Sequence, residues 1–492
     1  MPSPLSFFVY GIVLLVAAFL SRRRSNLKSG RIGIDPGIFG FRLWAAKQEF
    51  QASGHRLLDR GYHECKDENF WVQTPDMERL IVSPKFLPEL RVIPEGKLSH
   101  SASLVERLLG QYNGMDELIK SRQHSDVCRV QLTQKLPYFV PDMNEELRLA
   151  MPEFLKDVNT EKSTSIPTYA FAYTMVLSVA SRSFVSLPTS RDPQWLKAST
   201  DWQMTIWQVA AVLRPYPAWL RPILRPFLAP KSHLDRILKS AHDVLYPLID
   251  ERLRSEDKHL DLLQFLILTS KSIDKPALTL RLLGLMTAAL HTSSMVTTQA
   301  LYEMCAKTEY IADLRAEALE ALRDSEFWDL ARLKKLRKLD SFLKETMRLN
   351  QPDYLGFHRK VLQPIPLSNG VTLPKGLYIN MAADPLARDP ANYPEPNVFR
   401  PYRWYKPEPD HKPTLEEEFT GIEPGNIAWG SGRLTCPGRW YASSMIKLII
   451  AELLIKYDIA FPEGQTKRPP NVYSPDAVRP DMEQVICLKK RV

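Results

Sequence analysis

A long stretch with helical periodicity dominates the sequence. From about residue 102 to residue 343, apolar residues recur at spacings of three and four, which is typical of amphipathic helices. Short strand-like runs lie at 61–93, 354–404 and 472–492, and one more helix is expected at 440–457. No repeat, low-complexity tract or flexible linker separates these segments. We therefore expect one large, mainly α-helical domain with small β-sheets (an α+β fold), although 492 residues would by length alone favour about three domains.

The cysteines argue against two common kinds of stabilised domain. They are scattered, odd in number and never arranged as CxxC: Cys65, Cys128, Cys305, Cys436 and Cys487. A disulfide scaffold or a structural zinc site is not expected, because both normally use cysteines in pairs. The pattern suits a reducing compartment and at most one cysteine with special chemistry.

The formal net charge of +9 is unevenly distributed. Residues 1–31 hold five basic and no acidic side chains, so the rest of the chain carries +4. Such a mildly basic body suits an anionic membrane surface or an acidic protein partner. Nucleic acid is not an expected partner, since no basic stripe with interleaved aromatic residues is present.

The N-terminus has the pattern of a membrane anchor. Residues 5–20 (LSFFVYGIVLLVAAFL) are apolar and uncharged, at the short end of the about 17–25 residues that span a bilayer, and three arginines follow at 22–24. The positive-inside rule then places the body of the protein in the cytosol. The alternative is a cleaved signal peptide, whose charges would precede the apolar run. We expect an anchor at 1–24, a connector at 25–40 and a folded body at 41–492.

One cysteine lies in a segment suited to reactive chemistry. Residues 429–439 read WGSGRLTCPGR, so Cys436 sits in a glycine-rich loop just before the last expected helix. Backbone N–H groups and the positive end of a helix dipole stabilise a thiolate, and glycine lets a flat cofactor approach closely. A buried, inert cysteine beside a glycine turn is the alternative, and this loop alone does not decide between the two.

Two further segments carry charges in a fixed order along the chain. Glu345 and Arg348 lie three residues apart on one face of an expected helix. Downstream, FRPYRW at 399–404 contains Arg403, which precedes Cys436 by 33 residues. An E-x-x-R pair alone carries little information, because such surface pairs are common and weak.

In this order the segments resemble the cytochrome P450 superfamily, with its E-x-x-R helix, P-E-x-F-x-P-x-R segment and F-x-x-G-x-R-x-C-x-G loop. The resemblance runs along the whole chain and is strongest to the filamentous-fungal branch that oxidises terpenoid, meroterpenoid and alkaloid intermediates. It implies the cytochrome P450 fold, with 41–492 as a haem-thiolate catalytic domain. The implied cofactor is haem b, with Cys436 as the iron ligand and with Trp429 (in place of the usual Phe), Gly430 and Gly438 beside it.

The resemblance also implies a buried charge network behind the haem, formed by Glu345, Arg348 and Arg403. Such a network is stable only as a complete set, because one unpaired buried charge costs about 3–5 kcal/mol. We expect its role to be structural.

The segment at 280–304 resembles the family's helix on the oxygen-binding face of the haem. By this resemblance Ala289 faces the substrate, and Thr292 hydrogen-bonds dioxygen and relays protons. His291 stands where the family usually has a carboxylate, and histidine also transfers protons near neutral pH. Thr292 and His291 are therefore the candidate catalytic residues. The alternatives are a hydroxyl bonded to the preceding helical turn and an ordinary core histidine.

The residues that bind the haem propionates depart from the family pattern. Leu434 occupies a position that normally holds Arg or His. By resemblance Arg359, which follows the E-x-x-R helix, would bind a propionate. Arg433 and Arg129 are the other candidates, although Arg129 lies in a W-x-x-x-R-like segment with Ser125 in place of Trp.

The resemblance implies a monooxygenase that uses dioxygen and an apolar small-molecule substrate, with Leu355 and Phe357 in the substrate pocket. Thiolate ligation favours O–O cleavage, while the protein orients the substrate. Electrons would come from NADPH through a separate NADPH–cytochrome P450 reductase, since no dinucleotide fingerprint is visible. The implied location is the endoplasmic reticulum membrane, in contact with lipid, as a single-pass protein with its catalytic domain on the cytoplasmic side.

Other interpretations stay open. One is a haem-thiolate isomerase or dehydratase that needs no reductase, and another is a non-enzymatic haem sensor; Thr292 in its small-small-x-x-Thr setting argues against both. The Pro215–Pro230 segment (PYPAWLRPILRPFLAP) either dips into a membrane or forms a buried connection. Four basic residues either receive an acidic reductase surface or are simply solvated: Arg129, Lys135, Arg433 and Arg439.

Overall fold

The computed structural model describes residues 29–37, 40–256, 259–408, 411–474 and 477–492. The apolar run at 5–20, and with it the predicted anchor, lies outside these ranges. Among the residues that are described, no helix combines the length and apolarity needed to cross a membrane.

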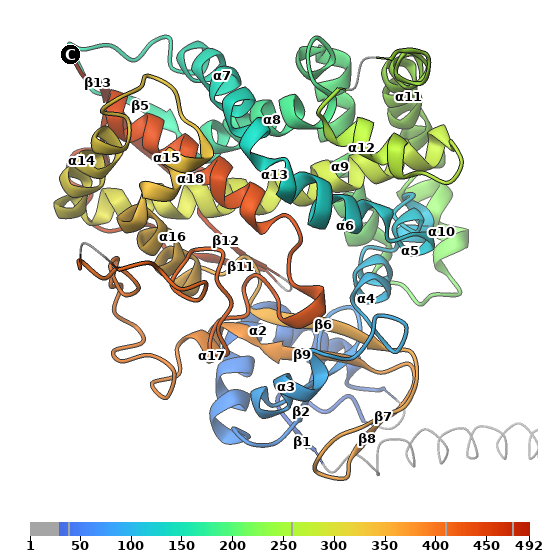
Figure 1. Ribbon diagram of the computed structural model, residues 1–492. Helices are drawn as coiled ribbons and strands as arrows, with labels where there is room; N and C mark the ends of the chain where they lie inside the picture. The colour runs from blue at the N-terminus through green and yellow to red at the C-terminus, as the bar shows by residue number, and fades with distance from the viewer. Residues whose placement is uncertain (1–28, 38–39, 257–258, 409–410, 475–476) are drawn as a thin grey trace, which may run out of the picture.

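Helices form most of the molecule and surround one long central helix, α13 (Lys275–Ala306), which runs through the middle of the helical part (Figure 1). Asp274 caps α13 by accepting a hydrogen bond from the Ala277 N–H at 3.1 Å. Most α13 side chains are buried, because other helices pack around it. The other helices are α2 (Leu43–Glu64), α3 (Leu87–Leu90), α4 (His100–Arg107), α5 (Glu117–Lys120), α6 (Gln123–Val127), α7 (Leu136–Phe154), α8 (Thr168–Val185), α9 (Pro193–Leu213), α10 (Arg221–Leu228), α11 (Lys231–Arg254), α12 (Leu262–Thr269), α14 (Ile311–Ala321), α15 (Leu330–Lys335), α16 (Arg337–Leu349), α17 (Ala383–Ala387) and α18 (Arg439–Lys456).

The largest sheet has six strands in the order β1-β2-β3-β9-β6-β4 and lies at the opposite end of the molecule from α7 and α8 (Figure 1). A second sheet has the order β10-β13-β5, and two hairpins pair β11 with β12 and β7 with β8. The strands are β1 (Gly30–Arg31), β2 (Phe70–Gln73), β3 (Glu78–Ile81), β4 (Leu98–Ser99), β5 (Thr164–Pro167), β6 (Leu355–Val361), β7 (Ile365–Pro366), β8 (Thr372–Leu373), β9 (Tyr378–Ala382), β10 (Tyr457–Ala460), β11 (Val472–Ser474), β12 (Ala477–Arg479) and β13 (Val485–Lys490).

Two large apolar cores hold these parts together, and a third, small cluster contains Leu109 and Leu213. The larger core is built from the helices and includes Trp202, Phe342 and Met445. The smaller core lies on the six-stranded sheet, where Val72 and Ile379 pack against α2. Residues that line the cavity described below come from both parts.

The structure confirms the predicted mixture of helices and small sheets, with the helical stretch observed from α4 to α16. Within the predicted connector at 25–40, Gly30 and Arg31 form β1, which pairs in parallel with β2, and Ile32 is buried.

Candidate active site

A cavity of about 1540 Å³ lies between the helices and the six-stranded sheet. Its walls come from α4, α8, α9, α13, β6, β12 and the loop before α18. Cys436 and Thr292, the two residues predicted to act on opposite sides of a haem, both line it. The structure thus brings together the segments that the sequence order had linked.

The loop that carries Cys436 is held by hydrogen bonds along its backbone. The Cys436 N–H donates to the Trp429 carbonyl at 2.7 Å, and the Trp429 indole N–H donates to the Phe419 carbonyl at 2.7 Å. Gly430 has φ of +81° and Gly432 has φ of +66°, conformations that favour glycine. A Cβ at Gly432 would overlap the Arg91 carbonyl oxygen, so the glycine also allows close packing.

Opposing effects act on the Cys436 thiol. Burial raises its pKa, while a hydrogen bond from the Gly438 N–H and the positive charge of Arg439 oppose that rise. Both opposing groups lie where they stabilise a thiolate. Cys128, also buried, has no such support, and burial raises its pKa to about 12.

The predicted charge network is present as a complete set. Glu345 accepts two hydrogen bonds from Arg348, at 2.7 and 2.8 Å, and three from Arg403, at 3.1 to 3.3 Å. Arg348 also donates to the Ala387 and Pro396 carbonyls, each at 2.7 Å. The Glu345 and Arg348 side chains are fully buried, so these bonds offset the cost of removing both charges from water.

One face of α13 borders the cavity. Its cavity-lining residues include Ala288, His291, Thr292 and Met295, which follow helical spacing. The prediction that Ala289 faces the substrate is therefore corrected: Ala289 packs against the helical core, and Ala288 takes the position on the cavity. The Thr292 hydroxyl donates to the Ala288 carbonyl at 2.8 Å, so the local bond foreseen as an alternative exists at the edge of the cavity.

His291 has aromatic and polar neighbours. Its Nδ1 lies 3.4 Å from the Tyr169 hydroxyl, and its ring centroid lies 5.9 Å from that of Trp207. Tyr169, Trp207 and His291 all line the cavity. Its ring is thus in contact with the cavity rather than sealed in a core.

The residues considered for the propionates lie in different places. Arg359 is buried in the cavity wall and donates to the His358 carbonyl at 2.8 Å. Burial lowers its pKa to about 10. Arg129 also lines the cavity, in a π-helical turn (Cys128–Leu132), and donates to the Arg433 carbonyl at 3.3 Å. The Arg433 side chain is exposed and is absent from the cavity lining, so its position does not support a propionate role.

Two histidines that the sequence did not single out as binding residues share this wall. His100 and His124 line the cavity, and burial lowers the pKa of each to about 4. His124 Nδ1 is buried and has no hydrogen-bond partner within the described part of the chain. No periodic pattern could have identified them, because their position depends on how α4 packs on β6 and how α6 packs on α12 and α13.

These residues fit haem. The cavity is large enough, and a Cβ at Gly438 would meet nothing within 4 Å, which leaves room beside the cysteine. Arg359 and Arg129 bring positive charge, and the unpartnered His124 Nδ1 can bond a carboxylate. The donor set thus suits a planar dicarboxylate whose iron is bound by sulfur.

The substrate-pocket residues Leu355 and Phe357 line the cavity on β6. The register of β6 against β9 shifts between Gly356 and Arg359, and Phe357 has φ of +53°. This bulge is a local strain that a β-strand pattern does not reveal.

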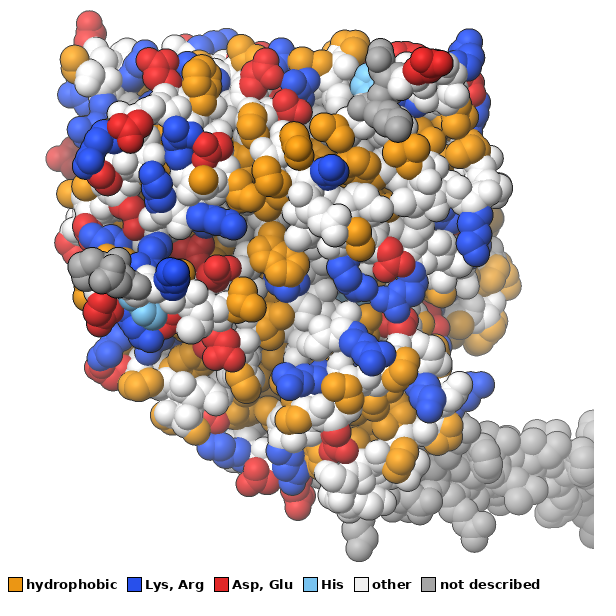
Figure 2. Space-filling model, in the orientation of Figure 1, with side chains coloured by type: hydrophobic (Ala, Val, Ile, Leu, Met, Phe, Trp, Pro, Cys, Tyr) orange, Lys and Arg blue, Asp and Glu red, His pale blue; other side chains and the backbone are white. Residues whose placement is uncertain are grey.

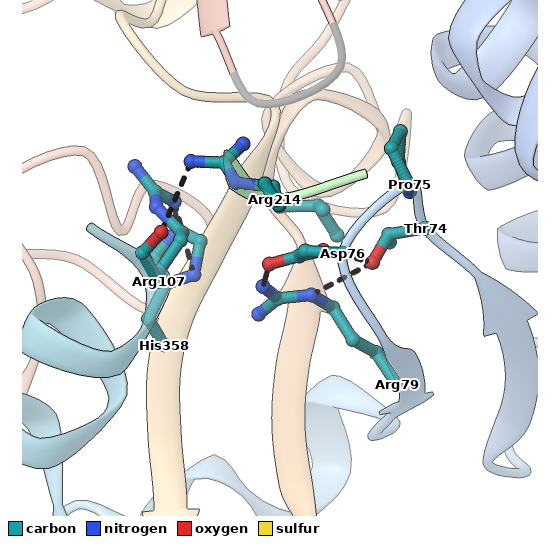
Figure 3. A pocket seen from close by; sticks show the side chains of 8 residues that line it. Thr74, Pro75, Asp76, Arg79, Arg107, Arg214 and His358 are labelled. Carbon is teal, nitrogen blue, oxygen red and sulfur yellow. Dashed lines mark hydrogen bonds and ion pairs between the residues drawn. The ribbon is translucent and has the colours of Figure 1, made fainter. Parts of the chain in front are cut away.

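Figure 3 shows a cluster of charged side chains that shares Arg107, Arg214 and His358 with the cavity lining. Asp76 pairs with Arg79 at 2.7 Å, and although burial acts to raise the Asp76 pKa, Arg79 and Arg214 hold it below its usual range. Arg214, at the end of α9, donates to the Arg107 carbonyl of α4 at 3.0 Å. Arg107 lies 3.2 Å from His358 Nε2 on β6. These contacts join α9, α4, β3 and β6.

Comparison with known proteins agrees with this geometry. The cytochrome P450 family model matches residues 102–488. "Cytochrome P450 monooxygenase AN1598" of Emericella nidulans is 30% identical over 467 residues, covering 92% of this chain and 87% of the relative. "Cytochrome P450 monooxygenase janP" of Penicillium janthinellum is 32% identical over 454 residues, covering 90% and 87%. "Ent-kaurene oxidase" of Gibberella intermedia is 29% identical over 455 residues, covering 91% and 86%.

A solved structure supports the fold. "Retinoic acid bound cyanobacterial CYP120A1" matches with a TM-score of 0.69 and 19% sequence identity, over 94% of this chain and 99% of that chain. The family match, the fungal relatives and the cysteine loop on a cavity of haem size agree with one another. The chain belongs to the cytochrome P450 family and is a monooxygenase of the fungal secondary-metabolism type, a group that uses haem with a cysteine thiolate ligand and electrons from NAD(P)H.

Proposed function

We propose that this enzyme hydroxylates or otherwise oxidises an apolar secondary-metabolite intermediate, of terpenoid, meroterpenoid or alkaloid type, with electrons passed from NADPH by a separate reductase. The main support for this proposal is that Cys436 and Thr292 line the same cavity, whose walls are mainly apolar and aromatic. Bound haem supplies oxygen activation and transfer to the substrate.

The residues of this chain divide the remaining tasks. Cys436 binds the iron, Arg359 and Arg129 bind the propionates with His100 and His124, and Trp429, Gly430 and Gly438 shape the haem-facing loop. Thr292 and His291 hold and move protons on the α13 face. Leu355 and Phe357 orient the substrate and exclude water. Glu345, Arg348 and Arg403 stabilise the fold behind the loop.

The substrate class is inferred from the walls and from the relatives. Leu104, Met204, Trp207 and Phe357 give the cavity its apolar and aromatic surface. One relative is named an ent-kaurene oxidase, and ent-kaurene is a hydrocarbon. An apolar polycyclic molecule suits a cavity of this volume and lining.

A second surface supports the proposal of membrane association. Every residue of α10 is at least partly exposed, so the Pro215–Pro230 segment is not a buried connection. Trp219 is 73% and Phe227 is 79% exposed, and on α2 Trp44 is 74% exposed. Trp44 and Pro215 also line the cavity, so this apolar surface borders its opening. We propose that it contacts endoplasmic reticulum lipid, in addition to the anchor predicted at 1–24, with the domain on the cytoplasmic side.

The proposed reductase site lies on the Cys436 side of the molecule. Arg129, Lys135 and Arg433 are exposed, and Arg439 stacks on Trp440 at 3.4 Å. These basic side chains suit an acidic flavoprotein. Among the described side chains on the face in Figure 2, basic and acidic groups are interspersed, which does not suit nucleic acid.

The test is product formation from labelled oxygen. Haem-loaded enzyme, a fungal reductase and NADPH are incubated under ¹⁸O₂ with a panel of terpenoid hydrocarbons and alkaloid intermediates. We expect a product that carries one ¹⁸O atom and forms only with NADPH and reductase. A reductase-independent product without ¹⁸O would instead indicate an isomerase or dehydratase. Haem binding without any product from the panel would favour a sensor. Either result contradicts the proposal.

A further inference from the structure

The cavity contains more positive than negative side chains. Seven cationic side chains line it, namely Lys47, Arg107, Arg122, Arg129, Arg214, Arg359 and Arg479, but only three carboxylates do, namely Glu95, Asp201 and Asp353. Two positive charges balance the propionates of haem. Several cations therefore need another partner or solvent.

All three carboxylates are already engaged. Glu95 accepts hydrogen bonds from the Ser99 hydroxyl at 2.8 Å and the Ser101 N–H at 2.9 Å. Asp201 pairs with Lys197 at 2.9 Å. Asp353 lies 2.6 Å from His358 Nε2.

Most of the arginines in the cavity wall have partners of their own. Arg359 and Arg214 donate to backbone carbonyls, Arg129 lies 3.6 Å from Asp126, and Arg107 lies 3.5 Å from Asp353. Arg122 has no ionic partner among the described residues, but it is exposed and therefore solvated.

Arg479 differs from these other arginines, although Lys47 on α2 is likewise partly buried without an ionic partner among the described residues. It is partly buried on β12, and no carboxylate in the described ranges pairs with its guanidinium. Its Nε is shielded from solvent without an acceptor in those ranges, as are the Nε atoms of Arg107 and Arg214. Those two arginines bond through their other nitrogens, whereas no side-chain hydrogen bond joins Arg479 to a described residue. A buried N–H group without a partner is rare in a folded protein and calls for an explanation by a ligand or water.

The neighbours of Arg479 place it beside the reactive face. Its positive charge acts on the Tyr169 hydroxyl, opposing the burial that raises the Tyr169 pKa to about 12. Tyr169 contacts His291 on the α13 face that carries Thr292. The other lining residues near β12 along the chain are Ser474, Ala477 and Met482, which carry no charge.

From this arrangement we infer that the substrate is an apolar molecule with one carboxylate group, and that Arg479 binds that carboxylate inside the cavity. An arginine fork matches a carboxylate with two parallel N–H···O bonds, and a single fixed charge orients an otherwise apolar body. The inference rests on the proposed function and narrows its substrate class to acids.

Binding of matched probes to the haem-loaded full chain tests the inference by calorimetry. The probes are abietic acid with its methyl ester and alcohol, and hexadecanoic acid with its methyl ester and alcohol. We expect at least one acid to bind about ten- to a hundredfold more tightly than its own ester and alcohol, the range for hydrogen bonds to a charged group. Acids of both shapes that bind no better than their esters and alcohols would overturn the inference.

Variants identify the residue responsible. Arg479→Leu should abolish the preference for the acid while changing ester affinity by less than about twofold, and Arg479→Lys should keep part of it. Arg122→Leu changes a solvated arginine of the same cavity and should keep the full preference for the acid. Equal loss in both leucine variants would contradict a specific role of Arg479.

The absorption spectrum separates this inference from the proposed function. Arg479→Leu should keep the haem content and the thiolate-type spectrum of the wild type. If it loses haem, Arg479 binds a propionate and the inference is wrong, while the monooxygenase assignment stands. If the acid binds as expected but no ¹⁸O is incorporated, the carboxylate site stands and the monooxygenase function proposed above is wrong.

Discussion

The region around Glu345 and the cavity that contains Cys436 differ in how their buried polar groups are bonded. Behind the cysteine loop, Glu345 accepts hydrogen bonds from two arginines. One of them, Arg348, also donates from its Nη1 group to two backbone carbonyls. In the cavity, His124 Nδ1 and Arg479 Nε are buried without partners among the residues described. The network is satisfied by protein groups alone, whereas the two cavity atoms can still bond a ligand. The two regions should therefore respond differently to mutation.

The largest effect is expected from Glu345→Ala. This change leaves Arg348 and Arg403 as buried charges without a carboxylate, at a cost of about 3–5 kcal/mol in the free energy of unfolding. Chemical denaturation would show it, together with loss of soluble protein. The matched control is Glu320→Gln, which removes an exposed pair with Arg323 and should cost less than about 1 kcal/mol. Equal costs for the two variants would contradict the structural role of the network.

Acid should weaken the haem-free protein through the cavity histidines. Burial and the charge of Arg359 lower the His100 pKa from about 6.5 to about 4. Between these values the unfolded chain binds a proton that the folded chain does not, so stability is lost as pH falls from about 6.5 to about 4, by at most about 3 kcal/mol. Denaturation at pH 7 and pH 4.5 measures this loss. His100→Gln should reduce the loss of unfolding free energy between the two pH values. His63→Gln, at an exposed position on α2, should leave that loss unchanged.

Thr292→Ala should impair chemistry without affecting the fold. Loss of a positioned proton-transfer group typically costs about a hundredfold or more in rate, seen here as less product per NADPH consumed. Thr297 is the control, because its hydroxyl makes the same backbone bond on α13, to Ser293 at 2.8 Å, but does not line the cavity. Thr297→Ala should leave the yield per NADPH near that of the wild type. Equal yields from both variants would argue against a role for Thr292.

Two glycines of the cysteine loop separate folding from cofactor binding. Gly432→Ala places a Cβ against the Arg91 carbonyl at a positive φ and should destabilise the fold by about 1–3 kcal/mol. The Cβ added by Gly438→Ala would meet no protein atom within 4 Å, so this change should alter the free energy of unfolding by less than about 0.5 kcal/mol. Its methyl group would point into the space we assign to haem, so haem content should fall. Normal haem content in Gly438→Ala would contradict that placement.

The comparison also shows what a sequence can predict. Glu345, Arg348, Arg403 and Cys436 lie in short segments with fixed spacing, and the structure brings the first three into one network. The helical stretch and the small sheets follow from periodicity. In these regions local sequence and final contacts agree.

The cavity wall was less predictable, because its residues meet only through tertiary contacts. His100, Tyr169 and Arg479 come from α4, α8 and β12, and nothing in their local sequence marks them. Ala289 was assigned one position away from the cavity face, since a family pattern fixes the helix but not the rotation of each side chain. The bulge at Phe357 depends on pairing between β6 and β9.

The most direct test of the account is the absorption spectrum of the reduced, haem-loaded protein with carbon monoxide. We predict the red-shifted Soret band of thiolate-ligated haem in the wild type and in Cys128→Ser, which removes the other buried cysteine near the site. Cys436→Ser should lack that band. A wild type that binds haem without the band, or a Cys436→Ser variant that retains it, would contradict the assignment of Cys436 as the iron ligand.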